Sequence, residues 1–355
     1  MKIVCLVDLY TDARQPLMIA EGLLQLNKNV VFNQDIWSLG EKLAEQEVPK
    51  KLKEDLLDCD LIFVPDFEHF GGGNHRPYHE GVTPSKEIWD FLNEKDLWSK
   101  IVVYDIKHED EYPDILDKCL AYFKREYLRW EPDGNFGRFT RRDKRIRPLN
   151  LSIVSAYEKM FKRVDHTKVR DIGYFFNPAV LFAHGSHYNR RVNVMIHLHQ
   201  AMWTGYDVQL TVEGWCSAIN SHDPVSFPPK EDADFDYWHI FEKYYKLMAN
   251  TKILIDAMPT RYVAPYRPWE VLASGSLCVL DPEKQEELEH PFEHGKHCLI
   301  YDSTSPPSIM EMIDQVKYYS KNDMKRERIA KAGLEHAQKY HKSINRVKKI
   351  LESIK

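Results

Sequence analysis

The residues from 265 to 275 read PYRPWEVLASG, and the apolar run Ser276–Leu280 follows them directly. This pattern predicts a short helix over Arg267–Ala273 and then a buried strand. Arg267 and Glu270 are three residues apart, so both project from one face of the first helical turn. Backbone N–H groups at that end of a helix attract anions. The stretch therefore predicts a guanidinium and a carboxylate at an anion-binding edge, with an ordinary surface ion pair as the alternative.

The alternation of strand and helix patterns continues in both directions from this stretch. Such alternation predicts parallel, doubly wound sheets, and 355 residues at about 150 per domain predict two of them. Strands are predicted by compact apolar runs and helices by apolar residues at helical spacing. The predicted strands are 2–9, 61–64, 101–104, 171–176, 208–212, 252–255, 277–280 and 298–301, and the predicted helices are 16–26, 85–98, 190–202, 237–249 and 267–273.

Two further stretches show how the chain is divided. The charged, turn-rich segment Glu131–Pro148 interrupts the alternation, and a second series begins near Val169, so we place a domain boundary near residue 165. From Ser308 onward the chain is highly charged with apolar residues three or four apart, which fits one amphipathic helix or two. Ligands of doubly wound sheets bind beyond the carboxyl ends of the strands, so functional residues are expected in the loops that follow strands.

Composition and motifs exclude several classes of protein. The 49 basic and 54 acidic residues give a net charge of −5, so no general attraction to nucleic acid or an anionic membrane is expected. No apolar run approaches the roughly 20 residues of a membrane-spanning helix, and Asp8 interrupts the first run, so we expect a cytoplasmic protein. The dinucleotide fingerprint and the P-loop motif are both absent from the sequence. The six cysteines lack the spacing of a metal site or a disulfide framework.

The sequence RPWEVLASG at Arg267–Gly275 resembles the donor-domain signature of GT-B glycosyltransferases. Tyr245–Ala257 resembles the helix and strand that precede this signature in that superfamily, and Phe292–Tyr301 and Gly333–Leu351 resemble segments that follow it. The resemblance covers about residues 170–355 and is greatest to the spore-maturation (CgeB-like) branch.

In the N-terminal half, the order of short landmarks resembles that of phage DNA β-glucosyltransferases. A Met-Lys-Ile start opens the chain, and Phe70-Gly71-Gly72 follows the strand after Asp60. A later strand, introduced by Lys100-Ile101, ends in Asp105-Ile106. The two resemblances together imply a GT-B fold, in which two doubly wound, Rossmann-like α/β domains face each other across a cleft.

The GT-B resemblance also implies a role for each domain. Residues 1–165 are expected to bind the acceptor, and the last helix, about 336–355, is expected to pack back on that domain as it does in relatives. Residues 166–335 are expected to bind a nucleotide-sugar donor. The activity implied is metal-independent transfer of a sugar, a hexose or a pentose, from a UDP-sugar to a hydroxyl group.

The residues expected to contact the diphosphate of the donor are cationic, because negative charge builds on this group as it departs during transfer. Arg267 is expected to contact the diphosphate, and Glu270 to accept hydrogen bonds from the ribose hydroxyls. The resemblance adds either Arg190 or Arg191, for which the alternative is a solvated surface position. The sequence lacks an Asp-x-Asp motif, so we expect no metal and no cofactor beyond the donor. Many retaining members have a second glutamate eight residues before the position of Glu270, where this chain has Tyr262.

An inverting transfer also needs a base that deprotonates the acceptor hydroxyl. The phage resemblance implies Asp105 for this role, because an aspartate at the matching strand end is the base in that family. A helix cap or an ion pair with Lys107 is the alternative for Asp105. The further candidates for the base are His108, Asp66, His75 and His79.

Two segments are candidates for acceptor binding. The glycine-rich loop with Gly71, Gly72 and His75 allows close backbone approach to a ligand, or is simply a turn. The segment Lys124–Arg147 contains nine basic and four acidic residues, among them Arg141 and Arg142, and aromatic residues lie between them. Such a segment could bind a phosphate backbone or an anionic glycan, or form a solvated loop.

These observations leave three functions open. We favour a glycan acceptor, because the run Phe123-Lys124-Arg125-Glu126 resembles a segment of CgeB-like glycan enzymes. DNA that contains a 5-hydroxymethylpyrimidine is the second possibility within the same enzyme class. A catalytically silent nucleotide-sugar-binding protein is the third, because the pair of carboxylates is incomplete.

Overall fold

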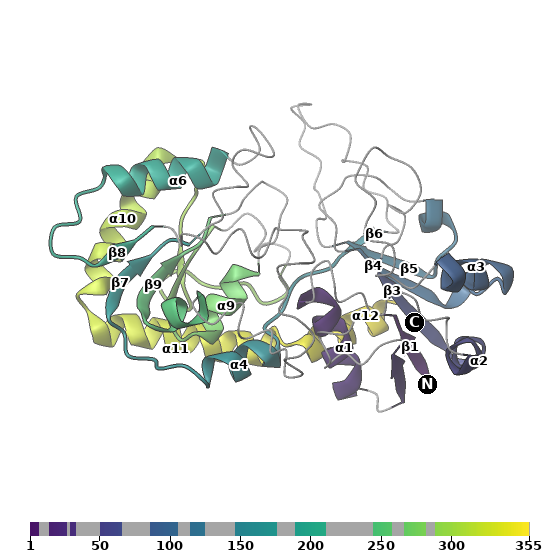
Figure 1. Ribbon diagram of the computed structural model, residues 1–355. Coiled ribbons are helices and arrows are strands. Elements are labelled where there is room, and N and C mark those ends of the chain that lie inside the picture. The colour runs from purple at the N-terminus through teal and green to yellow at the C-terminus, as the bar shows by residue number, and fades with distance from the viewer. Residues whose placement is uncertain are drawn as a thin grey trace, which may run out of the picture. The chain divides into compact units, whose positions relative to one another are not determined.

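The computed structural model describes residues 1–6, 14–26, 29–32, 50–65, 86–105, 114–124, 146–175, 189–210, 244–257, 266–281 and 288–354. The chain forms two compact units (Figure 1). The first comprises Met1–Leu151 and Ser343–Lys355, and the second comprises Ser152–Lys342. None of the described helices combines the length and the apolar character that crossing a membrane requires.

The first unit is built on a six-stranded sheet in the order β2-β1-β3-β4-β5-β6. All neighbouring strands in it are parallel. Its strands are short and mostly buried, as expected where helices cover a parallel sheet. They are β1 (Ile3–Cys5), β2 (Val30–Phe32), β3 (Leu61–Pro65), β4 (Ile101–Asp105), β5 (Ala121–Lys124) and β6 (Ile146–Pro148).

Helices α2 (Lys50–Asp58) and α3 (Lys86–Glu94) cover one face of this sheet. Leu56 of α2 and Leu92 of α3 join Val4, Val64 and Val103 of the strands in one buried cluster. Each of these side chains has no exposed surface. Burial of one such residue stabilises the fold by about 1.5–3 kcal/mol.

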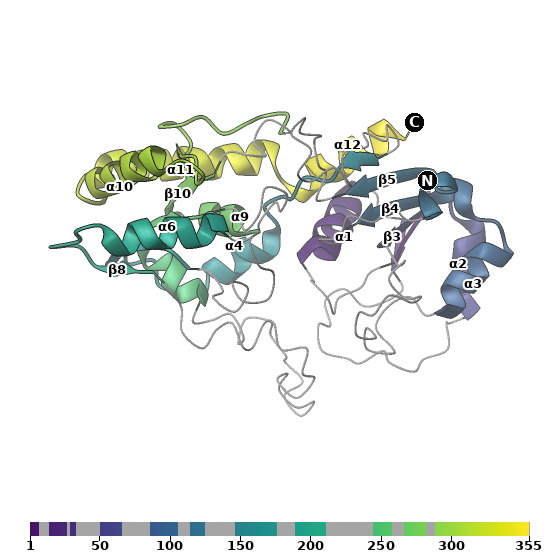
Figure 2. The ribbon, with the colours of Figure 1, turned by 90° about the horizontal axis from the view of Figure 1, so that it is seen from above.

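Helices α1 (Arg14–Leu26) and α12 (Ser343–Ser353) lie side by side in the first unit (Figures 1 and 2). They approach closely at Gly22, where a Cβ atom would lie 2.4 Å from Cγ2 of Val347. The Arg346 guanidinium of α12 donates through Nε to the carbonyl oxygen of Leu151 at 2.9 Å. The last helix of the chain is therefore part of the unit that contains the first strand.

The second unit is built on a five-stranded parallel sheet in the order β11-β10-β9-β7-β8. Counted within the unit, this is the doubly wound order 2-1-3-4-5, in which the winding direction changes between β7 and β9. The strands are β7 (Arg170–Gly173), β8 (Val208–Gln209), β9 (Thr251–Ile255), β10 (Leu277–Leu280) and β11 (Leu299–Ile300).

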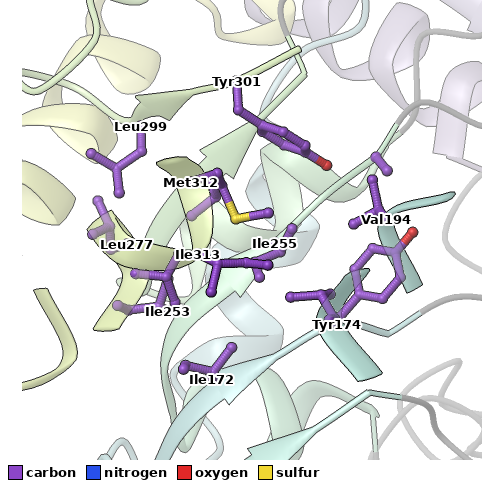
Figure 3. Packing of buried hydrophobic residues seen from close by; sticks show 14 of the residues in the cluster. Ile172, Tyr174, Val194, Ile253, Ile255, Leu277, Leu299, Tyr301, Met312 and Ile313 are labelled. Atoms are coloured by element: carbon purple, nitrogen blue, oxygen red, sulfur yellow. The ribbon is translucent and has the colours of Figure 1, made fainter. Parts of the chain in front are cut away.

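The core of the second unit lies between its sheet and helices that include α6 (Asn189–Gln200) and α10 (Pro306–Ser320), with Ile329 and Ala330 of a third helix. Figure 3 shows Ile172, Ile253 and Leu277 of three neighbouring strands packed with Ile313 of α10. Helix α11 (Asp323–Tyr340) contacts β10 and also α9 (Arg267–Ala273). Helix α11 thus holds α9 against the second unit's sheet.

The doubly wound α/β class predicted from the sequence is confirmed by both sheets. The predicted bounds of α9 and β10 coincide with the observed ones. The pattern missed β2, β5, β6 and helix α2, as well as α4 (Ser155–Phe161). Strands β2 and β6 have only three residues each, too few for a periodicity to be distinguished from chance.

The sequence predicted one or two helices in the C-terminal region, and the structure has three there. They are α10, α11 and α12, and they begin at Pro306. Ser305 caps α10 by accepting from the backbone N–H of Ser308. The break between α11 and α12 falls at His341 and Lys342, where the chain passes from the second unit to the first. A continuous amphipathic pattern concealed these breaks, because each helix keeps its own apolar face.

Gly333 of α11 permits close packing in the second unit, and its replacement by alanine is expected to lower stability. A Cβ atom there would lie 2.2 Å from the carbonyl oxygen of His297 and 3.0 Å from Cδ2 of Leu272. Backbone in the way cannot rotate aside, so we expect a loss of about 1–3 kcal/mol, although alanine favours an isolated helix.

Thermal unfolding of Gly333→Ala should show a melting temperature lowered by several degrees. Lys331→Ala is the matched control on the same helix, since Lys331 is exposed and surface changes usually stay within about 0.5 kcal/mol. An unchanged or raised melting temperature in Gly333→Ala would contradict the packing seen at this residue.

Candidate functional site

The candidate site lies at the carboxyl edge of the sheet in the second unit. Open α/β sheets bind ligands at this edge, at the point where the winding direction changes. Here that point lies between β7 and β9, whose carboxyl ends lead to Tyr174 and Asp256. The first turn of α6 contains Arg190 and Arg191, and α9 begins with Arg267, all near the same edge.

Helix α9 presents Arg267 at its first residue. Pro268 follows within the first turn, and Gly275, with φ of +71°, lies just beyond the helix end, both of which suit a short helix. The ring of Trp269 packs on Phe292 and His341, with centroids 5.9 and 5.4 Å apart. This packing fixes the helix and hence the direction of Arg267.

Arg267 is mostly buried and makes two polar contacts. Its Nη1 donates to Oδ1 of Asp256 at 3.3 Å, and its Nε donates to the hydroxyl of Tyr244 at 3.4 Å. Its side chain is 11% exposed. Burial lowers the pKa of Arg267, but Tyr244 and Asp256 outweigh this effect and leave the pKa raised. The guanidinium is therefore a fixed positive charge at the edge of the sheet.

Glu270 lies one turn further along α9 and is 2% exposed. Its Oε2 accepts a hydrogen bond from the Tyr244 hydroxyl at 3.1 Å, and its Oε1 accepts one from the Tyr245 hydroxyl at 3.3 Å. Tyr244 thus links Arg267 to Glu270.

Both arginines at the start of α6 are turned toward the sheet. Nε of Arg191 donates to the carbonyl oxygen of Ala257 at 3.0 Å, and Arg191 is 9% exposed. Nη1 of Arg190 lies 3.9 Å from Oδ2 of Asp281, which follows β10. The Tyr174 hydroxyl donates to the backbone oxygen of Arg191 at 3.1 Å and holds this turn of the helix. Neither arginine occupies the solvated surface position that was the alternative.

The structure also brings in acidic residues that the sequence analysis did not single out. Asp256 follows β9 and has no exposed surface, and Asp281 follows β10 and accepts from the hydroxyl of Ser303. The Tyr301 hydroxyl donates to the backbone oxygen of Asp256 at 3.0 Å, and Figure 3 shows Tyr301 among the residues of the buried cluster. A polar residue directly after a predicted strand was the signal that could have found both aspartates.

The candidates in the first unit are described only in part. Asp105 is the last residue of β4 and pairs in register with Lys124 of β5. Asp105 therefore lies at the carboxyl edge of its own sheet. The remaining candidates from the sequence fall outside the described residues, namely Asp66, Gly71, Gly72, His75, His79, His108, Arg141 and Arg142.

Two basic residues of this segment, Lys124 and Arg147, are described, and both pack within the first unit. Lys124 is 6% exposed. Arg147 lies over the ring of Phe123, 5.7 Å from its centroid, and donates to the carbonyl oxygen of Ser353. These two cations thus contribute to the fold.

Among the described residues, no group of three histidine, cysteine, aspartate or glutamate side chains is arranged to hold a metal ion.

Comparison with known proteins gives a family match and a shared fold. Residues 190–352 match the family described as glycosyl transferase-like. A solved alpha-glucosyltransferase in complex with UDP and a 13-mer DNA has a TM-score of 0.56 at 12% identity, over 99% of this chain and 98% of that one. A glycosyltransferase from Rickettsia africae ESF-5 has a TM-score of 0.54 at 9% identity, over 99% and 97%. No curated protein matches the sequence significantly.

At these identities the likeness to solved structures shows a common fold, which is GT-B. The fold and the family match together define the class, a glycosyltransferase with the GT-B fold. The family match covers Arg190, Arg191, Arg267 and Glu270, that is, the part of the chain in which the candidate site lies.

Proposed function

We propose that the protein transfers a sugar from a UDP-sugar to a hydroxyl group of a glycan. The second unit binds the donor and the first binds the acceptor. The observation that carries this proposal is the group of three mostly buried arginines, Arg190, Arg191 and Arg267, at the carboxyl edge of the second sheet. Buried guanidinium groups at a ligand-binding edge suit a diphosphate, because they bind phosphate oxygens in a fixed fork geometry.

In this proposal each site residue has a separate role in the reaction. The acceptor oxygen forms a bond to the anomeric carbon while the bond from that carbon to the diphosphate breaks. Arg267, with Arg190 and Arg191, offsets the negative charge that builds on the departing UDP. Glu270 accepts hydrogen bonds from the ribose hydroxyls, for which a carboxylate has a suitable set of lone pairs. Because the arginines supply the positive charge, the transfer proceeds without a metal ion.

Asp105 is the base in this proposal. Its carboxylate takes the proton of the acceptor hydroxyl as that oxygen attacks. Support comes from its place as the last residue of β4, since catalytic groups of doubly wound domains stand at the carboxyl ends of strands. His108 is the next candidate.

We propose that the acceptor is a glycan and that the chain belongs to the CgeB-like branch. Both proposals rest on the resemblance of Arg267–Gly275 and of residues 123–126 to segments of CgeB-like enzymes. DNA with a hydroxymethylated base is the second candidate. The observation that favours it is the shared fold with an alpha-glucosyltransferase bound to DNA over 99% of this chain. Lys124 and Arg147 of the basic segment pack within the first unit. This packing weighs against the use of these two cations in binding DNA.

The proposal is tested first by donor binding. UDP is expected to raise the melting temperature of the protein more than GDP, ADP or CDP does, because a ligand stabilises the folded state that binds it. At a concentration about 100 times Kd the stabilisation is about 2.7 kcal/mol, which corresponds to roughly 5–10 °C for a unit of this size. Equal shifts with all four nucleotides, or none, would contradict a UDP-sugar donor.

The acceptor is then identified by transfer of labelled sugar from the donor that binds. Glycan and hydroxymethylated duplex DNA are offered separately. Label in the glycan supports the proposed acceptor, and label in the DNA establishes the second candidate instead. Donor binding with label in neither indicates the catalytically silent binding protein.

A further inference from the structure

The candidate donor site has a balanced set of charges before any donor is present. Within the part of the chain that the structure describes, the three arginines of this edge face three carboxylates, those of Asp256, Glu270 and Asp281. A nucleoside diphosphate adds several negative charges to this set. Since all of these side chains are mostly buried, the excess negative charge is costly unless it is neutralised.

Asp256 is the most deeply buried of these three carboxylates. It has no exposed surface. Its Oδ1 accepts from Arg267, whereas its Oδ2 has no hydrogen-bond partner among the described residues and lies away from solvent. One oxygen of this carboxylate is therefore buried without a hydrogen-bond donor. A proton could be added to Oδ2 without breaking a hydrogen bond.

The charged and titratable groups that face Asp256 come from every element around it. Helix α9 contributes Arg267 and Glu270, and α6 contributes Arg191. Tyr174 after β7, Cys278 of β10 and Tyr301 after β11 each interact electrostatically with Asp256. Asp281 after β10 interacts with both tyrosines. Burial raises the pKa of Asp256 above its usual value, Arg267 and Arg191 lower it, and Glu270 raises it, with a net rise. Arg267 is thus the main group that lowers the pKa of Asp256 and opposes the effect of burial.

We infer that donor binding is coupled to uptake of one proton by Asp256. This inference rests on the proposed function and names a property of the same site. When the diphosphate draws the Arg267 guanidinium to its own oxygens, Asp256 loses its principal counter-charge and gains a second negative neighbour. A proton taken up from solvent then forms an O–H bond at Oδ2, and the carboxyl group becomes neutral. Asp256 thereby changes from the charged partner of Arg267 into a neutral group that adds no negative charge beside the diphosphate.

The inference is tested by titration calorimetry of the full chain with UDP-glucose. UDP-glucose is the suitable probe because neither of its phosphates is terminal, whereas a terminal phosphate has its own ionisation near pH 6. Titrations at one pH, slightly above neutral, are repeated in buffers that differ in ionisation enthalpy. The dependence of the observed heat on the buffer gives the number of protons taken up, which we expect to approach one. The affinity should also fall by up to about tenfold per pH unit as the pH rises.

Asp256→Asn provides the second arm, because asparagine has the shape of the protonated carboxyl group and cannot titrate. This variant is expected to bind UDP-glucose without proton uptake, with an affinity that does not change with pH and that exceeds that of the parent at high pH. Asp171→Asn is the matched control, since Asp171 is a mostly buried carboxylate on the same sheet that pairs with Lys252 instead. Proton uptake should persist in this control.

Each outcome has a defined meaning. Binding of UDP-glucose by the parent with a heat that is the same in all buffers overturns the inference and leaves the proposed function standing. Persistent proton uptake in Asp256→Asn also overturns it. Absence of binding by the folded parent overturns both. The buffer series on the parent alone decides the question if Asp256→Asn does not fold.

Discussion

Replacement of Arg267 by alanine is expected to lower kcat/KM by about 10²- to 10³-fold, with a large loss of UDP affinity. Removal of one group that stabilises developing charge typically has an effect of this size. Arg267 is the arginine held between Asp256 and Tyr244, and its side chain is 11% exposed. A water molecule in the space left by alanine cannot replace a fixed guanidinium. The measurement is steady-state transfer together with calorimetric binding of UDP.

Controls separate this loss from misfolding. Arg267→Ala leaves the buried Asp256 carboxylate without its cation, which by itself destabilises the fold. The double variant Arg267→Ala, Asp256→Asn removes both charges, so we expect its stability to recover while UDP affinity stays low. Arg170→Ala is the control for an arginine elsewhere on the same sheet, since Arg170 pairs with the exposed Asp207. Near-normal transfer by Arg267→Ala would remove the diphosphate role of this residue.

The local part of the site around Arg267 is predictable from the sequence, and its contacts with distant residues are not. The spacing of Arg267 and Glu270 is local, and one helical turn is enough to place them on the same face. Their partners come from elsewhere, Asp256 from the end of β9 and Tyr244 from the helical residues 244–249. These pairings depend on the order of strands in the sheet, which one sequence does not specify.

The same reason explains which elements of the fold were missed. Helix α9 and strand β10 were predicted with their observed bounds, because a continuous apolar run leaves one interpretation. Strand β6 has three residues, of which Ile146 alone is fully buried. Its conformation is set by pairing with β5, in which Tyr122 lies opposite Ile146. Contacts of this kind override local propensity.

Asp105→Asn is expected to lower kcat by about 10²- to 10⁴-fold, the usual cost of removing a general base. Asparagine keeps the size of the side chain and cannot accept a proton from the acceptor hydroxyl. Donor binding should be unchanged, because Asp105 lies on the first sheet, whereas the arginines proposed to bind the diphosphate belong to the second unit. The measurement compares kcat for transfer with the affinity for UDP in the same preparation.

A matched control and a competing residue make this prediction specific. Asp60→Asn tests an aspartate near the opposite end of the same sheet, where Asp60 accepts a hydrogen bond from the backbone N–H of Lys2, and it should transfer at the parent rate. His108→Gln tests the next candidate. If Asp105→Asn retains near-full kcat and His108→Gln loses it, the histidine is the base. If both retain it, the base lies outside this strand end, since a group that removes the proton in the rate-limiting step cannot be replaced without loss of rate.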